Sequence, residues 1–477
     1  MYMKSLLPVL AICFYGISVN AQKKWTLKDC VEYAMANNIS VKMTEVQAQL
    51  AQVTYAQSKF SQLPNAQFTG NSSINSGNNQ DPITFRQITQ TYTSAGFQLQ
   101  SSADIFNFYS KRNTIAANNW ELAAAKANVD KLKNDISLSI ANIYLQVLLA
   151  KEQENITLVQ VQQTNAQLAN TQKLVDAGSL PPLNSTQLEA QLAVDSGNYI
   201  TAKGSVIQNL LNLKANMNLD PGGVFEVDAP SLESIPLDPI ADLQPENVYA
   251  LALKNQPLQR FNELKLKAGE KKKAAARGAM YPMLSAFGSL GSGYNNQSQQ
   301  IVGSTPILMP LGSVSVGGTS YDVFPAQPFT NYTYGKTTFP NQLSDNFSQS
   351  FGLSLNVPLF NGRSLRSNYE RSKLTISSLQ LQKAQDDQTL KQNIFQAYNA
   401  VLIALEKFNA SKRSVDASSL TYEYALKRFD VGILNTFDLI TTQNNVLRAK
   451  LEYSINRFDY VFKMKVLEFY KGNGLRL

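Results

Sequence analysis

The sequence contains one pattern twice, and this duplication limits the folds that the chain can adopt. Residues 34–64 align with residues 252–282 at a constant offset of 218. From Phe106 onward the two copies align at an offset of 254. The offset changes once, between Pro64 and Phe106, where the second copy is 36 residues longer. Matches that hold without slippage over such lengths indicate an internal repeat rather than a shared composition.

Single residues follow the second offset closely. Tyr144 corresponds to Tyr398, and Gly178 corresponds to Gly432. We therefore predict two structural repeats and a connection between them. The first repeat covers residues 22–220, the linker 221–243 and the second repeat 244–477.

The N-terminus predicts an exported protein. Lys4, an apolar stretch from Leu6 to Ile17 and the small-residue site at 19–21 are typical of a secretory signal peptide over residues 1–21. The apolar stretch is too short to cross a bilayer as a helix. No later segment approaches the ~18 consecutive apolar residues of a transmembrane helix. We therefore expect an exported chain without a helical anchor.

The composition argues against an enzyme. The chain has no histidine, which removes the commonest general base and the commonest metal ligand. Signal cleavage would leave Cys30 as the one cysteine, so an intramolecular disulfide is impossible. The net charge of +8 is modest for 477 residues, and basic and acidic residues are mixed along the chain. We expect no catalytic residues, no cofactor, no metal and no nucleic-acid partner.

Two long stretches without glycine or proline predict two long helices. Neither residue type occurs between Gly96 and Gly178 or between Gly362 and Gly432, and good helix formers dominate both stretches. At ~1.5 Å per residue, a helix over residues 107–175 would be about 100 Å long. Its apolar residues recur at steps of three and four, which is coiled-coil spacing: Leu122, Ala125, Val129, Leu132, Ile136, Ile140, Ile143 and Val147. Because helices of this length do not fit inside a globular domain, we expect an elongated molecule.

Each long helix is predicted to turn and continue as a returning helix, which makes an antiparallel hairpin. The long helices are placed at about 107–175 and 363–430, and the returning helices at about 184–219 and 437–471. The returning helices have only half the length of the long ones. Helices expected at 42–63 and 260–281 would complete the second arm by stacking end to end with them.

The turns carry recognisable helix-ending and helix-starting residues. Residues 176–178 and 430–432 each end in a glycine, which can adopt the left-handed conformation that closes a helix. Asn184 and Asn435 are each followed three residues later by a Gln or an Asp. This spacing predicts an N-cap at both positions.

After Pro64 the period of the apolar residues changes to two, which predicts strands. The strands are placed at about 66–75, 95–106, 283–291 and 346–360. An apolar face and a small polar face over roughly ten residues are typical of a membrane β-barrel strand. The connections at 76–92 and 295–345 are interpreted as loops on the cell exterior, the second one being longer.

A soluble antiparallel sheet with one solvated face is the alternative interpretation of these strands. The polar face, however, consists of Ser, Gln and Asn with few charges. Four strands also cannot close by themselves, and open edges are not viable in lipid. A membrane barrel would therefore need several copies of the chain. A dimer would give eight strands and a trimer twelve, and the pattern does not choose between them.

Three groups of residues connect this pattern with a known family. They are Pro64 and Pro282 at the helix-to-strand switches, 358–362 (Pro-Leu-Phe-Asn-Gly) at a strand-to-helix switch, and 429–432 with 437–439 at the second turn. In this order, within a duplicated exported chain, they resemble the TolC-like outer membrane efflux protein family (outer membrane factors). The first copy departs from the pattern at residues 103–107, which lack the proline and the glycine.

The resemblance implies a fold that combines α-helices with a membrane β-barrel. Duplicated helical hairpins would form a long α-helical tunnel through the periplasm. Each chain would contribute four strands to a 12-stranded barrel of a homotrimer, surrounded by outer membrane lipid. The partners implied are a periplasmic adaptor (membrane fusion) protein and an inner membrane transporter.

The implied function is passive conduction of small molecules, such as drugs and toxic compounds, as the exit duct of a tripartite efflux pump. An exit duct for type I protein secretion is one alternative. An elongated coiled-coil structural protein of the cell surface is another, from a different class.

The resemblance also implies functional residues at the turns. In the family, a Tyr–Arg–Asp network and a further Asp close the tapered end, at positions that match Phe429, Leu434, Asp438 and Thr441 here. Because Asp438 alone keeps its carboxylate, we hypothesise closure by helix packing and by apolar contacts of Phe429, Leu434 and Phe437. A plain alternative is that Asp438 only stabilises its helix dipole. Adaptor docking is expected at both turns: Asp176, Gly178, Ser179, Asp430, Gly432 and Ile433.

Overall fold

The computed structural model describes residues 24–80, 85–228 and 235–472. The predicted signal peptide (1–21) lies outside these residues. The chain divides into two compact units, and the division cuts across the sequence repeats. The first unit holds the described residues up to 52, from 120 to 267 and from 377 onward, and the second holds 53–119 and 268–376. Each repeat contributes to both units, because the strand pairs of the two repeats join in one sheet.

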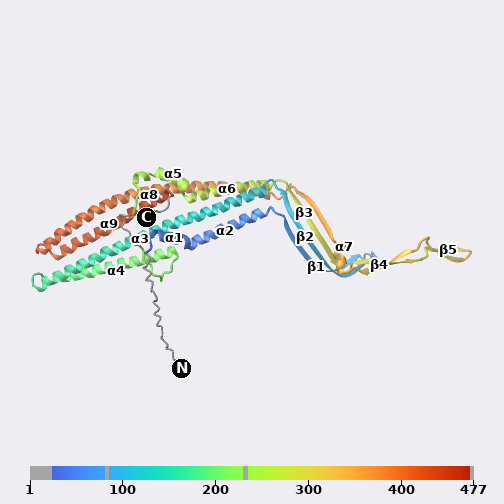
Figure 1. The fold of residues 1–477 in the computed structure, drawn as a ribbon, viewed down its shortest axis with the longest axis horizontal. Helices are drawn as coiled ribbons and strands as arrows, with labels where there is room; N and C mark the ends of the chain where they lie inside the picture. Colours follow the sequence, from blue (N-terminus) through green and yellow to red (C-terminus); the bar gives the residue numbers. More distant parts are fainter. Residues whose placement is uncertain (1–23, 81–84, 229–234, 473–477) are drawn as a thin grey trace, which may run out of the picture. The chain divides into compact units, whose positions relative to one another are not determined.

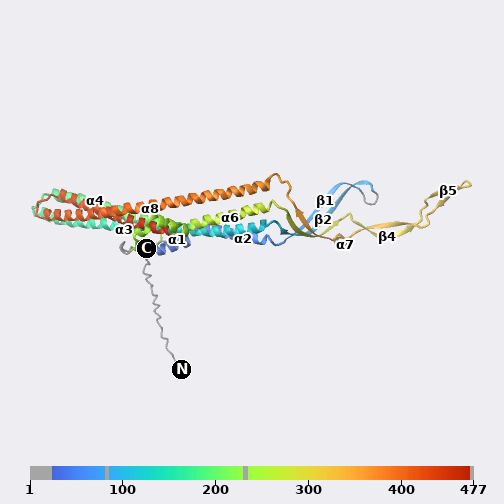
Figure 2. The ribbon, with the colours of Figure 1, turned by 90° about the horizontal axis from the view of Figure 1, so that it is seen from above.

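The helices of the two repeats correspond almost residue for residue. The first repeat has α1 (Leu27–Asn37), α2 (Ile39–Phe60), α3 (Ser110–Asp176) and α4 (Leu183–Met217). The second has α5 (Pro245–Asn255), α6 (Pro257–Gly278), α8 (Ser364–Asp430) and α9 (Thr436–Tyr470), preceded by the 3-10 helix η2 (Ile240–Leu243). The long helices α3 and α8 have 67 residues each. In the first unit, α3 runs beside α4 and α8 beside α9 (Figures 1 and 2). Among the described residues, no helix combines the length and apolar character needed to cross a membrane.

Each returning helix meets a shorter helix at an equivalent joint. Asn38, between α1 and α2, donates its side-chain amide to the carbonyl of Asn216 near the end of α4 (3.0 Å). Gln256, between α5 and α6, donates to the equivalent carbonyl of Tyr470 at the end of α9 (3.2 Å). These amides supply partners to carbonyl groups that the end of a helix leaves free. The split second arm predicted from the sequence is therefore fastened by side-chain amides at the same place in each repeat.

Two related apolar clusters form the core of the first unit. One surrounds Tyr144 and Ile140 of α3, and the other surrounds Ile394 of α8, which corresponds to Ile140. Tyr144 is 1% exposed, and its hydroxyl donates to the carbonyl of Asp228 (2.5 Å). Burial raises the pKa of Tyr144, so the hydroxyl remains a donor. This bond attaches the segment before α5 to the long helix α3.

Four antiparallel strands form the main sheet of the second unit. They are β1 (Asn65–Gln80), β2 (Gln87–Phe106), β3 (Met283–Asn295) and β8 (Ser348–Asn356), in the order β1-β2-β3-β8. Figure 1 shows β1, β2 and β3 side by side. Most of the predicted loop 76–92 is strand, because backbone pairing from Asn75–Tyr92 to Gln80–Gln87 does not require an apolar face. β8 ends at Asn356, short of the predicted 360, and Pro358 has no N–H with which to continue a ladder.

The predicted loop 295–345 is also largely regular, so its interpretation as a loop is wrong. It contains β4 (Gln299–Ile307), β5 (Gly312–Val316), β6 (Thr319–Val323), β7 (Phe329–Lys336) and the short helix α7 (Phe339–Asp345). β4 pairs with β7, and β5 pairs with β6. Gly317 and Gly318 have φ angles of 61° and 90°, as a two-residue hairpin turn with the twist of its strands requires. The Gly-Gly pair between the alternating residues of β5 and β6 was a hairpin signal that the interpretation as a loop overlooked.

The two copies make the same strand-to-helix turn with different residues. In the second copy Gly362 and Arg363 have positive φ angles of 61° and 66°. In the first copy Phe108 and Tyr109 occupy these positions with φ angles of 47° and 62°. A left-handed non-glycine residue costs roughly 1–2 kcal/mol. Stacking of the Phe108 ring on Tyr281, with centroids 4.9 Å apart, offsets this cost.

We expect Tyr144→Phe to lower the free energy of unfolding by about 1–3 kcal/mol, because the buried carbonyl of Asp228 would lose its donor. Tyr398→Phe is the matched control, since the hydroxyl of Tyr398 accepts one exposed bond, from Gln244 (3.3 Å). Urea unfolding can be followed by the fluorescence of Trp25, which packs against the cluster of Tyr144. Equal effects of the two substitutions would contradict a structural role for the Tyr144 hydrogen bond.

Candidate functional sites on the sheet and at the helical turns

The register of the sheet sorts its side chains onto two faces. Leu99 of β2 lies opposite Phe68 of β1 and Leu290 of β3. The apolar residues of this face are Phe68, Ile74, Phe97, Leu99, Leu284, Leu290, Phe351, Leu353 and Leu355. The other face carries mainly Gln67, Thr69, Asn71, Gln98, Gln100, Ser285, Ser289, Ser348, Ser350 and Ser354. The alternation predicted from the sequence is therefore continuous across all four strands.

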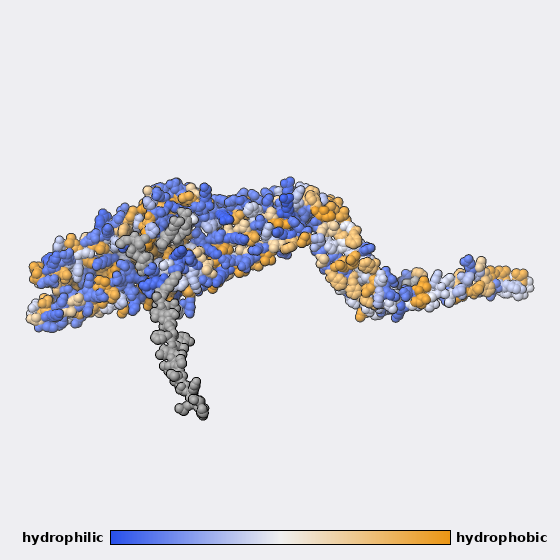
Figure 3. Space-filling view, viewed as in Figure 1, coloured by the Kyte–Doolittle hydropathy of each residue, from blue (hydrophilic) through white to orange (hydrophobic). Residues whose placement is uncertain are grey.

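The apolar face is exposed to an unusual degree. Phe68, Phe351, Leu353 and Leu355 are 67%, 75%, 68% and 66% exposed. The space-filling view shows hydrophobic residues gathered over the strands of the second unit (Figure 3). A contiguous exposed apolar surface marks contact with a membrane or a partner. With a polar surface on its other side, on which Asp104 pairs with Ser285, the sheet has the two faces of a membrane barrel wall.

Glycines on β3 and β8 lie opposite aromatic residues of the neighbouring strand, and the aromatic rings pack directly over them. A Cβ atom on Gly288 would lie 2.9 Å from the ring of Phe351, and one on Gly352 would lie 2.7 Å from the ring of Phe287. Each ring therefore covers the glycine of its cross-strand partner, one on each face of the sheet. Such pairs fix the register of strands that have few large side chains.

The sheet is incomplete as a membrane structure within one chain. In the described part of the chain, β1 pairs with β2 alone and β8 pairs with β3 alone. One edge of each strand thus presents free backbone N–H and C=O groups. In hydrocarbon each such group would cost several kcal/mol. Because the apolar face suits lipid and unpaired backbone groups are costly there, β1 and β8 each need a further strand beside them.

The two helical turns have the same backbone geometry. Gly178 and Gly432 take left-handed φ angles of 66° and 74°. The amide of Ser179 donates to the carbonyl of Leu174, and that of Ile433 donates to Arg428, both at 2.9 Å. These bonds close the last turns of α3 and α8. The six residues predicted for docking are all exposed at these turns: Asp176, Gly178, Ser179, Asp430, Gly432 and Ile433.

One of the two predicted N-caps is confirmed, and the other is wrong. The side chain of Asn435 accepts from the amide of Asp438 (2.8 Å), and its amide group donates to the Asp438 carboxylate (2.9 Å). Asn184 lies inside α4, which begins at Leu183 after Pro182 and has no side-chain cap. Proline is favoured at a helix start because its fixed φ suits the first turn, so the helix begins before Asn184.

The residues predicted for closure fall into a buried and an exposed group. Phe429 is 7% exposed and packs with Leu439, and Leu434 lies against the same cluster. Leu180 of the first turn joins this cluster, so it connects the two hairpins within one chain. Phe437, Asp438 and Thr441 are exposed on the first turns of α9.

Tyr422 is a residue at this end that the sequence did not point to. It packs against the cluster of Phe429. Burial raises the pKa of Tyr422, and the carboxylate of Asp430 raises it further, so its hydroxyl remains protonated.

A buried polar cluster was also missed from the sequence. Asp195 of α4 is 1% exposed and accepts from Thr164 of α3 (2.6 Å) and from Gln191 (2.9 Å). Gln443 of α9 donates to the same Thr164 hydroxyl (3.0 Å). The cluster therefore joins the first hairpin to the returning helix of the second. One signal was present, because Asp195 lies seven residues after the buried Leu188 and so occupies a core position of the heptad.

The comparisons with known proteins identify the family. The sequence matches the model of the outer membrane efflux protein family over residues 31–219 and 248–461. The chain belongs to this family. No curated protein sequence matches it.

Solved outer membrane channels share the fold. The channel CusC is 14% identical, with 94% of this chain and 92% of that chain covered and a TM-score of 0.75. VceC from Vibrio cholerae is 14% identical, with 94% and 97% covered and a TM-score of 0.70. The open state of MtrE from Neisseria gonorrhoeae is 17% identical, with 94% and 89% covered and a TM-score of 0.68.

These findings confirm the family and the fold class predicted from the sequence. The protein is an outer membrane efflux family member that combines long helical hairpins of a tunnel with strands of a membrane β-barrel. The family consists of channel proteins rather than enzymes. The exposed apolar face of the sheet is accordingly the part of the chain suited to outer membrane lipid.

We expect Leu353→Lys to reduce the amount of protein in the outer membrane fraction strongly. A lysine on a lipid-facing strand position costs up to about 2–4 kcal/mol near the bilayer centre. Ser354→Lys is the matched control, because Ser354 is the next residue of β8 and lies on the polar face. Immunoblots of separated membranes measure both variants. A comparable loss for Ser354→Lys would contradict the assignment of the two faces.

Proposed function

We propose that this protein passively conducts small molecules, such as drugs and toxic compounds, out of the cell as the exit duct of a tripartite efflux pump. The observation that carries the proposal is the two-faced sheet in a chain of the efflux family. Its apolar face suits lipid, and its other face offers Ser, Gln, Asn and Thr to water. Such a wall can enclose a wet passage without binding a permeant of either charge tightly.

The open edges of the sheet support a homotrimer. Three copies, with β8 of one beside β1 of the next, would form a closed barrel of twelve strands. An eight-stranded barrel from a dimer would be filled by its own side chains. Twelve strands leave room for a passage and satisfy the backbone groups at both edges.

Exposed apolar side chains at the helical turns support docking of a periplasmic adaptor that recruits an inner membrane transporter. Val431 and Ile433 are 69% and 67% exposed. Two large apolar side chains exposed at one turn favour contact with a protein partner over contact with water. On this proposal the helical part extends into the periplasm, and both turns, with Ser179 in the first, contact the adaptor.

Closure at this end is proposed to be apolar. Phe429 and Leu434 set the shape of the second turn from inside, because they pack within the chain. Phe437, at 66% exposure, would close the passage against its copies in the trimer. Asp438 and Thr441 would lie next to this constriction. Asp438 would then add a ring of negative charge to its role in the cap.

Type I protein secretion is the second candidate function, since the same duct could serve it. The inner membrane transporter recruited at the helical turns distinguishes efflux from protein secretion, because the two processes use different classes of transporter. An elongated coiled-coil surface protein has no support, given the family and the sheet.

We expect a single cysteine at Ser179 or at Ile433 to cross-link in living cells to a periplasmic adaptor, and through it to the transporter. Cys30 can be left in place because it is 0% exposed and burial raises the pKa of its thiol to about 12. Mass spectrometry of the adducts would identify the transporter, and its class would separate efflux from protein secretion.

Gly204→Cys is the control for this experiment. Gly204 is exposed on α4, distant in sequence from the turn, and a Cβ atom there would meet nothing within 4 Å. Adaptor capture from Gly204 alone, or no capture from either turn in cells that contain the assembled protein, would overturn the docking proposal.

We expect Phe437→Ala to raise the single-channel conductance in planar bilayers, because the proposed apolar constriction would widen. Asp438→Asn should leave the conductance similar but lower the preference for cations. The cap would survive, because Asn435 accepts from the backbone amide of residue 438, and an asparagine can still accept the side-chain bond from Asn435. An unchanged conductance for Phe437→Ala would contradict apolar closure, and an unchanged cation preference for Asp438→Asn would limit Asp438 to its helix.

A further inference from the structure

An uncharged pocket lies in the second unit, where β1, β2 and β3 meet the segment from Asn295 to Asn346. Its volume is about 840 Å³, within the ~300–1,000 Å³ typical of small-molecule sites. Thirteen residues line it, and all are uncharged: mostly Gln, Asn, Ser and Tyr. Such a lining disfavours an ion, which would lose water without gaining a counter-charge.

Hydrogen bonds around the buried Gln342 hold the floor of the pocket in place. Gln342 of α7 is 2% exposed, and its side chain accepts from the amide of Asn295 (2.8 Å) and donates to the carbonyl of Asn295 (2.9 Å). The side chain of Asn346 donates to the carbonyl of Gly293 (2.7 Å). These bonds fasten α7 and the start of β8 to β3. The floor is therefore formed before any ligand arrives, which lowers the entropy lost on binding.

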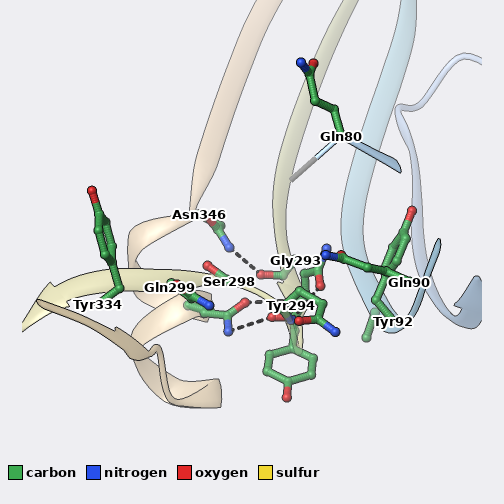
Figure 4. Close-up of a pocket in the computed structure, with 13 residues that line it drawn as sticks. Gln80, Gln90, Tyr92, Gly293, Tyr294, Ser298, Gln299, Tyr334 and Asn346 are labelled. Carbon is green, nitrogen blue, oxygen red and sulfur yellow. Dashed lines mark hydrogen bonds between the residues drawn. The ribbon is translucent and has the colours of Figure 1, made fainter. Parts of the chain in front are cut away.

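The walls of the pocket carry polar groups that are still free to bind. Figure 4 shows Gln90 extending toward Gly293 with Tyr92 beside it, whereas Tyr334 stands apart, beyond Ser298 and Gln299. The amides of Gln90 and Gln299 and the hydroxyls of both tyrosines have no hydrogen-bond partner among the residues that the structure describes. An amide offers donors and an acceptor in one plane. A tyrosine adds an apolar ring with a polar tip.

We propose that this pocket binds a neutral saccharide. A sugar presents neighbouring hydroxyl groups that both donate and accept, which matches the side-chain amides of Gln90 and Gln299. The C–H groups on the face of a sugar ring match the rings of Tyr92 and Tyr334. Neutral sugars need no counter-charge, and the lining provides none.

The register places Gln90 and Tyr92 of the pocket lining on the polar face of the sheet, whereas Ala95 and Tyr294 lie on the face of Leu99. Gln90 and Tyr92 share a face of β2 with Ser94 and Gln98, and Ser94 lies opposite Asn295. This part of the inference rests on the proposed function, in which that face lines the passage. The saccharide would then come either from an exported compound leaving the duct or from a glycan at the cell surface.

Binding is tested with the purified full chain in a detergent without a sugar headgroup, such as lauryldimethylamine oxide. Maltotriose, cellotriose and triacetylchitotriose are the probes, and calorimetry and saturation-transfer NMR are the readouts. Gln90→Ala and Tyr92→Phe should each raise the Kd of the bound trisaccharide by about three- to tenfold, as the loss of one or two neutral hydrogen bonds predicts.

Gln98→Ala is the matched control, because Gln98 lies on the same face of β2 outside the pocket lining. It should leave the Kd unchanged. The proposal is overturned if none of the three trisaccharides binds, or if Gln98→Ala weakens binding as much as Gln90→Ala does.

Two further arms separate the sources of the saccharide. Competition by lipopolysaccharide isolated from the host would indicate a surface glycan. Retention of a radiolabelled glycoside in cells that carry Gln90→Ala would indicate an exported compound. Adaptor cross-linking from Ser179 is measured in the same cells. If the wild-type protein binds no saccharide while adaptor capture is intact, the pocket proposal alone is refuted. If the wild-type protein binds saccharide but captures no adaptor, the pump assignment alone is refuted.

Discussion

The architecture of this protein depends on the unpaired backbone N–H and C=O groups at the two open edges of its sheet. β1 and β8 each have a neighbour on one side among the described strands, and their outward apolar side chains suit hydrocarbon, where no water can satisfy an N–H or C=O group. Closure of a barrel by further copies satisfies these groups and also explains why the opposite face is polar. Because the strands must close into a barrel, this polar face lines its interior. Small polar residues on that face leave room for a passage that large side chains would fill.

The duplication supplies the same joints twice but not with the same residues. Asn38 and Gln256 differ in length yet donate to equivalent carbonyls. Gly362 takes a left-handed conformation without strain, whereas Phe108 takes it at a cost that stacking on Tyr281 offsets. Backbone geometry is thus kept between the copies, and the side chains that maintain it have diverged. A motif search that demands the glycine would miss the first switch.

The helical end shows how packing assigns roles that a motif comparison cannot. Phe429, Leu434 and Phe437 look equivalent as apolar residues near one turn. In the structure the first two join Leu180 in a cluster that ties the hairpins together, and Phe437 remains exposed. Phe429 lies at the end of α8, Leu434 in the turn and Phe437 at the start of α9, so their burial and not their sequence separates structural residues from candidates for a constriction. The buried carboxylate of Asp195 makes the same point for polar residues.

The sequence by itself determined the repeat, the long helices, the turns and the two-faced strands. These depend on local periodicity, glycine placement and the absence of helix breakers, which neighbouring residues encode. The tertiary structure decided which strands pair, that the polar segments 76–80 and 299–336 continue as strands, and that the saccharide-sized pocket forms beside α7. It also moved the start of α4 ahead of Asn184. The pairing of β2 with β3 and the contact of Gln342 with Asn295 join residues far apart in the chain, which no local pattern records. The start of α4 and the turn between β5 and β6, by contrast, depend on Pro182 and on Gly317-Gly318, which a finer analysis of the sequence could have used.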